Sequence, residues 1–153
     1  MINLGQVGLG YWGPNLLRNF QALPGGKVQK VCDLDRSALD RAQETYSDLM
    51  CTMDYDDLLG DPDIEAVVVS SSAPAHYSLA KAALEANKHV FVEKPIALRV
   101  DHAEALVALA DERGLVLMVG HLLQYHPVFV RLKKMALDDP VSRRIGVLFA
   151  RLL

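Results

Sequence analysis

The sequence predicts an α/β fold in which helices wind around both faces of a mostly parallel sheet. Short apolar runs alternate along the chain with stretches whose apolar residues recur at helical spacing. The first run, residues 2–7, leads into Gly8-Leu9-Gly10-Tyr11-Trp12-Gly13, and a helical pattern follows. The second run ends on an acidic residue, Asp33, about 20 residues after Gly13. A strand, a G-x-G-x-x-G turn, a helix and a later acid are the fingerprint of a dinucleotide-binding Rossmann fold.

The first half of the chain gives three strands and three helices. The helix after the glycines is indicated by Leu16, Leu17 and Phe20 at helical spacing. Ser37 is the expected N-cap of a helix that reaches about Tyr46. The remaining expectations here are strands at 2–7, 28–32 and 50–52, and one helical turn at 55–59.

The second half continues the same alternation. The β-branched run 66–69 is typical of a central strand of a parallel sheet. A serine-rich loop, 70–74, separates it from a helix over 75–86. A strand at 89–92, a helix from Asp101 to Arg113 ended by Gly114, and a sixth strand at 115–119 complete the pattern.

The rhythm changes after the sixth strand. Pro127 is expected to start a helix that reaches about residue 137, and residues 145–153 have the composition of a strand. We therefore expect a Rossmann domain over 1–126 and, over 127–153, the truncated start of a second domain. The alternative is that 127–153 folds back onto the sheet as an added element.

The glycines and the acid predict the cofactor. Gly8 permits a tight turn, Gly10 lets the backbone approach a pyrophosphate, and Gly13 lets helix and strand pack closely. Asp33 can accept hydrogen bonds from the adenosine ribose and would repel a 2′-phosphate, so NAD is favoured over NADP. Tyr11 could cover the pyrophosphate together with its neighbour Trp12, or both could be ordinary half-buried aromatics. The other interpretation of the motif is that the glycines only turn the chain.

Composition narrows the class of protein. The chain has 153 residues, of which 51% are hydrophobic and 23% charged, with a net charge of −3. We expect no nucleic-acid partner, because no basic run stands out, and no membrane span or signal peptide. A cytoplasmic protein is therefore expected. Two cysteines without metal-site spacing favour neither a disulfide framework nor a metal centre.

The strand ends carry the candidate chemistry, because ligands of open α/β sheets bind outside the carboxyl ends of the strands. Lys94 follows the strand 89–92 and could hold a substrate hydroxyl or move its proton, although most lysines are solvated surface charges. Ser70 and Ser71 can hydrogen-bond ribose or amide groups. His76 could contact the nicotinamide ribose, or it could be packed locally near the helix start.

Together these residues resemble the Gfo/Idh/MocA family of NAD(P)-dependent oxidoreductases. The matching segments are VGLGYWGPN at 7–15, CDLD at 32–35 and HYSLAKAALEANKHVFVEKP at 76–95. The resemblance implies that Lys94 is the catalytic lysine and that Glu93 and His76 line the nicotinamide site. It also implies a C-terminal α+β domain that supplies further acid/base residues, most of the substrate pocket and a homo-oligomer interface.

Two segments depart from the family pattern. Ser71-Ser72 stand where the family has Thr-Pro, and Leu122 and Leu123 stand where an Asn and Arg pair is common. The glycine segment is most similar to the branch that acts on nucleotide-linked sugars. The resemblance thus implies hydride transfer between NAD and a hydroxyl of a sugar or sugar nucleotide. The alternatives are a family dehydrogenase of inositol or another polyol, and a non-catalytic nucleotide-sensing or interaction domain.

Overall fold

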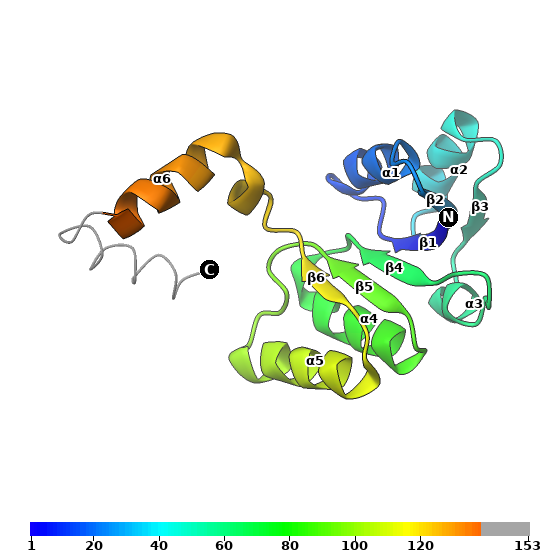
Figure 1. Ribbon diagram of the computed structural model, residues 1–153. Helices are drawn as coiled ribbons and strands as arrows, with labels where there is room; N and C mark the ends of the chain where they lie inside the picture. The colour runs from blue at the N-terminus through cyan, green and yellow to red at the C-terminus, as the bar shows by residue number, and fades with distance from the viewer. Residues whose placement is uncertain (139–153) are drawn as a thin grey trace. The chain divides into compact units, whose positions relative to one another are not determined.

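A six-stranded parallel sheet organises the N-terminal part of the protein (Figure 1). The structure is a computed structural model that describes residues 1–138. The strand order is β3-β2-β1-β4-β5-β6, and every pair of neighbours is parallel. The strands are β1 (Ile2–Val7), β2 (Gly26–Cys32), β3 (Met50–Thr52), β4 (Ala66–Val69), β5 (His89–Val92) and β6 (Leu117–Val119). The predicted doubly wound Rossmann sheet is confirmed.

Five helices connect these strands. They are α1 (Gly13–Gln21), α2 (Arg36–Thr45), α3 (Tyr55–Leu59), α4 (Ala73–Glu85) and α5 (Val100–Arg113). Two predicted helix starts were wrong by two residues, and β6 begins at Leu117 rather than at the predicted residue 115. The N-cap of α2 is Asp35 rather than Ser37, because the Asp35 carboxylate accepts hydrogen bonds from the Ser37 amide (2.9 Å) and hydroxyl (2.7 Å). The helix α4 begins at Ala73 rather than Ala75, since a proline fits the first turn of a helix, where its missing N–H is not needed.

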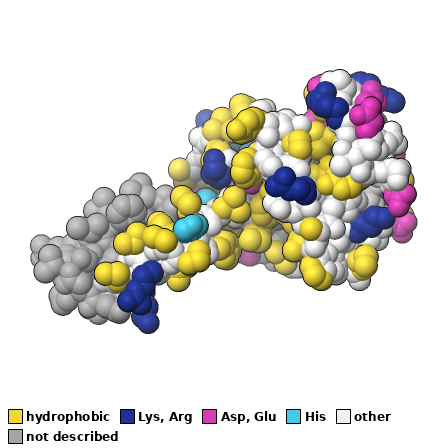
Figure 2. Space-filling model, turned by 90° about the horizontal axis from the view of Figure 1, so that it is seen from above, with side chains coloured by type: hydrophobic (Ala, Val, Ile, Leu, Met, Phe, Trp, Pro, Cys, Tyr) yellow, Lys and Arg dark blue, Asp and Glu magenta, His cyan; other side chains and the backbone are white. Residues whose placement is uncertain are grey.

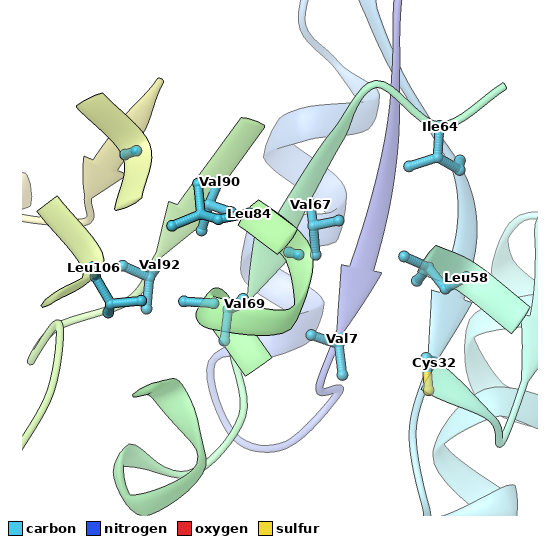
Figure 3. Close-up of a cluster of buried hydrophobic side chains, with 13 residues drawn as sticks. Val7, Cys32, Leu58, Ile64, Val67, Val69, Leu84, Val90, Val92 and Leu106 are labelled. Atoms are coloured by element: carbon cyan, nitrogen blue, oxygen red, sulfur yellow. The ribbon is translucent and has the colours of Figure 1, made fainter. Parts of the chain in front are cut away.

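The larger core lies on the face of the sheet that carries α3, α4 and α5. Val7, Val69 and Val92 of the strands share this core with Leu84 of α4 and Leu106 of α5 (Figure 3). These five side chains are at most 7% exposed. A strand row of β-branched residues covered by helices is what a buried parallel sheet requires.

The other face is covered by α1 and α2. Leu17 of α1 and Leu39 of α2 pack with Val28 and Val31 of β2 in a second core. Helices on both faces leave the strand ends as the places where the backbone meets solvent and ligands.

The strand order reverses between β1 and β4. The connection from β1 runs through α1 to β2 on one side, whereas β4 pairs with β1 on the other, with Leu4 opposite Ala66 and Val7 opposite Val69. In open α/β sheets such a switch point opens a crevice at the carboxyl ends of the strands. The loops after β1, β2, β4 and β5 all meet at this edge.

A second compact unit begins at His121. Its described part has a 3₁₀ turn, η1 (Leu122–Tyr125), and a helix, α6 (Pro127–Asp138), which confirms the helix predicted from Pro127. The strand expected at 145–153 lies outside the described residues, and the domain boundary at 126 stays a prediction. Among residues 1–138, no helix combines the length and the apolar character that crossing a membrane requires.

Candidate functional site

The glycine turn after β1 has three positions that each need a glycine for a different reason. Gly8 has a φ of +97°, and a Cβ there would lie 2.6 Å from the backbone of Ser70 and Ser71. A Cβ on Gly13 would lie 2.5 Å from the carbonyl oxygen of Gly8. A Cβ on Gly10 would meet nothing within 4 Å. The turn is therefore packed from below and open at Gly10.

The helix α1 begins directly after this opening. Pro14 occupies its first turn, and the N-cap residue Trp12 makes no side-chain capping bond. No acidic residue stands in the first turn. An uncapped helix N-terminus beside an open glycine offers N–H groups and a positive dipole end to an anion.

The two aromatic residues of the turn differ in exposure. The side chain of Tyr11 is 97% exposed and that of Trp12 is 42% exposed. Tyr11 is thus not a half-buried aromatic in this structure, and its side chain is free to cover a ligand. Whether either ring covers a pyrophosphate stays a prediction.

Asp33 is held in place by backbone amides. One carboxylate oxygen accepts from the Leu9 amide at 2.5 Å and the other accepts from the Asp35 amide at 2.8 Å. The carboxylate therefore joins the glycine turn to the loop after β2. It lines an open pocket of about 400 Å³, together with Gly10 and Tyr11 of the turn and Arg41 of α2.

The loop after β4 is bound to the glycine turn from the other side. Ser70 is 6% exposed, and its hydroxyl donates to the Gly8 carbonyl at 2.7 Å. Ser71 is half-buried, with its hydroxyl 3.5 Å from the Ser72 carbonyl. The hydroxyl of Ser70 is thus used to bind the glycine turn. Within residues 1–138, the hydroxyl of Ser71 makes only one long hydrogen bond, which a ligand could replace.

His76 connects the loop after β4 to the loop after β5. Its ring is 1% exposed, with Nδ1 2.7 Å from the Pro95 carbonyl oxygen and Nε2 3.0 Å from the Ser71 carbonyl oxygen. A neutral imidazole donates from one nitrogen only, and the tautomer decides which carbonyl it serves. The His76 ring therefore packs between the backbones of both loops and donates to one of them. Its direct contact with a nicotinamide ribose stays a prediction.

Glu93 and Lys94 stand at the carboxyl end of β5 with opposite exposures. Glu93 is 7% exposed; its Oε2 accepts from the Lys94 amide at 3.1 Å, and its Oε1 has no hydrogen-bond partner among the described residues. A Cβ added to Gly120 would lie 2.9 Å from this Oε1, so Glu93 packs closely against that glycine. Lys94 is exposed, precedes a cis bond to Pro95 and takes part in none of the ion pairs formed within residues 1–138. The Lys94 ammonium is thus available to a ligand, while the Lys94 backbone is fixed by its hydrogen bond to Glu93.

Sequence reasoning missed Gln6. It lies in β1, is fully buried, and contacts both ends of the glycine turn. A polar residue within an apolar strand, two positions before the first glycine, is the signal that could have indicated it.

The charges that the structure describes are dispersed. On the face seen in Figure 2, Lys and Arg side chains are scattered among apolar and uncharged ones, and some stand next to acidic side chains. Within residues 1–138, no three His, Cys, Asp or Glu side chains come together as metal ligands would.

Comparison with known proteins agrees with this geometry. Residues 2–121 match the model of the Gfo/Idh/MocA oxidoreductase family, described as having an NAD-binding Rossmann fold. The chain belongs to this family. The matched span of the Gfo/Idh/MocA domain contains the glycine turn, Asp33 and the Glu93-Lys94 pair.

Among the relatives of this Gfo/Idh/MocA domain is the inositol 2-dehydrogenase of Salmonella typhimurium, which is 32% identical over 149 residues, covering 95% of the chain and 44% of the relative. The UDP-N-acetylglucosamine 3-dehydrogenase of Acidithiobacillus ferrooxidans is 30% identical over 138 residues, covering 89% of the chain and 42% of the relative. The chain thus spans less than half the length of these relatives.

Solved structures of the family superpose on the same region. GenD2 from gentamicin A biosynthesis, in complex with NAD, gives a TM-score of 0.84 at 32% identity over 90% of the chain and 39% of its own. KijD10, a 3-ketoreductase from Actinomadura kijaniata in complex with NADP and TDP-benzene, gives a TM-score of 0.82 at 31% identity over 90% of the chain and 42% of its own. Neighbours of this fold have therefore been crystallised with either nicotinamide cofactor.

Proposed function

We propose that the chain is the NAD-binding domain of a dehydrogenase that transfers a hydride between NAD and a hydroxyl of a sugar or sugar nucleotide. One observation carries the proposal. A carboxylate for a ribose follows β2 and a lysine for a substrate follows β5 of the same parallel sheet, and the open glycine turn follows β1, which lies between these two strands. The family membership supports it.

The chain's own residues fit a dinucleotide. The open side of Gly10 and the uncapped start of α1 would hold the pyrophosphate. Asp33, already aligned by the Leu9 amide, would hold the adenosine ribose hydroxyls. A 2′-phosphate would meet the negative charge of Asp33, which favours NAD over NADP. When bound, the nicotinamide supplies the hydride acceptor or donor that the side chains lack.

Lys94 is the proposed catalytic residue. Its ammonium can donate a hydrogen bond to a substrate hydroxyl and so orient the C–H bond next to it. A lysine can also take up or release the proton of that hydroxyl. The Glu93 carboxylate accepts a hydrogen bond from the Lys94 amide and so fixes the position of the Lys94 backbone.

His76 and Ser71 lie next to the loop that carries Lys94, and we propose that they belong to the same site. The His76 ring lies between the carbonyls of Ser71 and Pro95 and donates to one of them, so its packing sets the distance between the loops after β4 and β5. We assign His76 a positioning role at the nicotinamide end of the site. The Ser71 hydroxyl is the group of this loop that could bond a cofactor amide or ribose.

The substrate class rests on the relatives. One acts on a nucleotide-linked sugar and another on inositol, as their names state. Inositol and a hexose ring both carry secondary alcohols, and a lysine such as Lys94 could donate a hydrogen bond to either. A polyol such as inositol is therefore the second candidate substrate. A homo-oligomeric assembly and a cytoplasmic location stay predictions.

A non-catalytic nucleotide sensor would use the same turn and the same Asp33. It would not need Lys94, which is exposed beside the buried Glu93 and takes part in none of the ion pairs that residues 1–138 form, so the geometry at Lys94 favours the enzyme.

The cofactor part is tested by calorimetric titration of NAD and NADP into the wild type and Asp33→Asn. We expect the dissociation constant for NAD to rise about tenfold, as for the loss of one charge-assisted hydrogen bond, and the preference for NAD over NADP to shrink. Asp48→Asn, an exposed acid, is the charge-matched control and should bind like the wild type. Equal NAD affinity in Asp33→Asn would contradict the ribose assignment.

The catalytic part is tested in the polypeptide that the complete gene encodes. Lys94→Met should lower kcat about a hundredfold or more, in line with the loss of acid–base catalysis, with little change in NAD affinity. Lys27→Met, at an exposed position of β2, is the matched control. Undiminished turnover in Lys94→Met would favour the sensor or another catalytic group.

A further inference from the structure

Gln6 is the one fully buried polar side chain of β1, and it lies under the glycine turn. Its Nε2 is 2.9 Å from the Gly13 carbonyl oxygen, 3.2 Å from the Gly8 carbonyl oxygen and 3.0 Å from the Ser70 hydroxyl. Its exposed fraction is 0%. One amide nitrogen thus contacts the residue that opens the turn, the residue that closes it, and the end of β4.

The orientation of this amide follows from its neighbours. If the amide were flipped, Oε1 would face the carbonyl oxygens of Gly8 and Gly13, and two acceptors would be forced together. With nitrogen there, the two N–H groups are shared among three acceptors. The Gly8 carbonyl also accepts from the Ser70 hydroxyl at 2.7 Å, so it has a donor of its own.

Packing alone does not account for a glutamine at this position. Its Oε1 is buried and has no hydrogen-bond partner among the described residues. An unpaired buried acceptor is unfavourable, and an apolar side chain of similar length would avoid it. Leu4, two residues earlier and so on the same face of β1, packs in the second core, which shows that this face accommodates apolar side chains. Gln6 therefore needs a reason beyond filling space.

We propose that Gln6 is a positioning residue that sets the spacing between Gly8 and Gly13, and so prepares the turn for the pyrophosphate of NAD. The two carbonyls belong to the two ends of the turn, and Gly10 lies on its open side. The Leu9 amide is taken by Asp33, and with both carbonyls drawn inward the amides of residues 10–12 are left for an anion. This inference rests on the NAD binding proposed above.

The steric contacts of the turn support this role. The Cβ positions of Gly8 and Gly13 are already closed by backbone atoms at 2.6 and 2.5 Å. A turn packed this closely has little freedom to adjust when a ligand arrives. A small shift of its ends would therefore misplace the amides, and catalytic or binding groups misplaced by about 1 Å lose much of their effect.

The test compares Gln6→Met with Gln21→Met. Gln21 is the matched control, because it also donates from Nε2 to a backbone carbonyl, that of Val28 at 2.8 Å, at the far end of α1. For Gln6→Met we expect the dissociation constant for NAD to rise about tenfold, while the Tm without NAD stays within the range of the control. Gln21→Met should bind NAD like the wild type. In the polypeptide from the complete gene, Gln6→Met should raise KM for NAD and leave kcat at saturating NAD unchanged.

The possible results separate the two proposals. A wild type that does not bind NAD overturns the proposed function and this inference together. A wild type that binds NAD, with a folded Gln6→Met that binds equally well, overturns the inference alone. If Gln6→Met does not fold, Ser70→Ala decides, because it removes one of the three contacts: a rise of about threefold in the dissociation constant supports the role, and no rise overturns it.

Discussion

Replacing Gly13 by alanine tests the packing of the turn most directly. The added Cβ would stand 2.5 Å from the Gly8 carbonyl oxygen and 3.1 Å from its carbonyl carbon. Both are backbone atoms, so no side-chain rotation relieves the contact. Gly8 cannot retreat either, because its own Cα packs on the backbone of Ser70. Either α1 moves away from β1 or the turn opens.

The size of the effect follows from this contact. Overpacking a well-packed site costs about 1–3 kcal/mol. For a chain of this length each 1 kcal/mol lowers the Tm by roughly 4 °C, so Gly13→Ala should unfold roughly 4–12 °C below the wild type. Differential scanning fluorimetry without ligand measures this difference, and calorimetry with NAD should show weaker binding.

Gly10→Ala is the matched control for folding. Its Cβ would meet nothing within 4 Å, and Gly10 is not among the glycines with positive φ. Its Tm should therefore stay within about 2 °C of the wild type, as expected for an exposed substitution. Its methyl group would stand where the pyrophosphate approaches, so NAD binding should fall at least about tenfold. Equal Tm values for the two variants would refute the packing argument, and wild-type NAD affinity in Gly10→Ala would refute the assigned approach of the pyrophosphate.

Three further predictions concern the remainder of the Rossmann unit. Lys88→Met should lower stability by about 1–3 kcal/mol in urea unfolding, because the buried Lys88 ammonium donates to the carbonyls of Asp61 (2.8 Å) and Ile64 (2.6 Å), and both lose a donor. The hydrogen bond from Lys30 lowers the pKa of the Asp61 carboxyl in the folded protein. The ionised carboxylate therefore stabilises the fold fully above the usual aspartate pKa of about 3.9, and this stabilisation is lost as pH falls through the lowered folded value. In urea unfolding, Asp61→Asn should be less stable than the wild type at pH 7, and this difference in stability should disappear toward the acid limit. Burial, with a smaller contribution from the charge of Asp33, raises the pKa of the Cys32 thiol to about 11. After iodoacetamide treatment at pH 8, mass spectrometry should therefore find Cys51 of β3, which is less buried, alkylated before Cys32.

The strands and their order of appearance could be predicted because short, mostly apolar runs of three to six residues leave few alternatives in a β–α alternation. Helix starts were harder. Asp35 and Ser37 are both good N-caps and stand two residues apart, so local chemistry alone does not choose between them. The choice falls on Asp35 because Asp33, bound to the Leu9 amide, accepts from the Asp35 amide and fixes the path of the chain before the helix.

The candidate site shows the same division. Asp33 could be predicted from its distance along the chain, but its contact with Leu9 depends on the register between β1 and β2. His76 could be placed near the crevice, but its enclosure depends on how the Pro95 carbonyl meets it, which no local pattern encodes. Gln6 was missed because hydrophobic periodicity treats a single polar residue in a strand as noise.

The central place of β1 has a consequence for synthesis. The strand can pair with β2 once residue 32 has left the ribosome, yet its other edge stays unpaired until the partners of Leu4 and Val7 in β4, residues 66–69, have been made. At roughly 5–20 residues per second, these 37 further residues take about 2–7 s. During that interval the nascent chain exposes an unpaired strand edge, which is open to wrong pairing with other chains. Slow codons between β3 and β4 should therefore lower the yield of folded protein more than slow codons after β5.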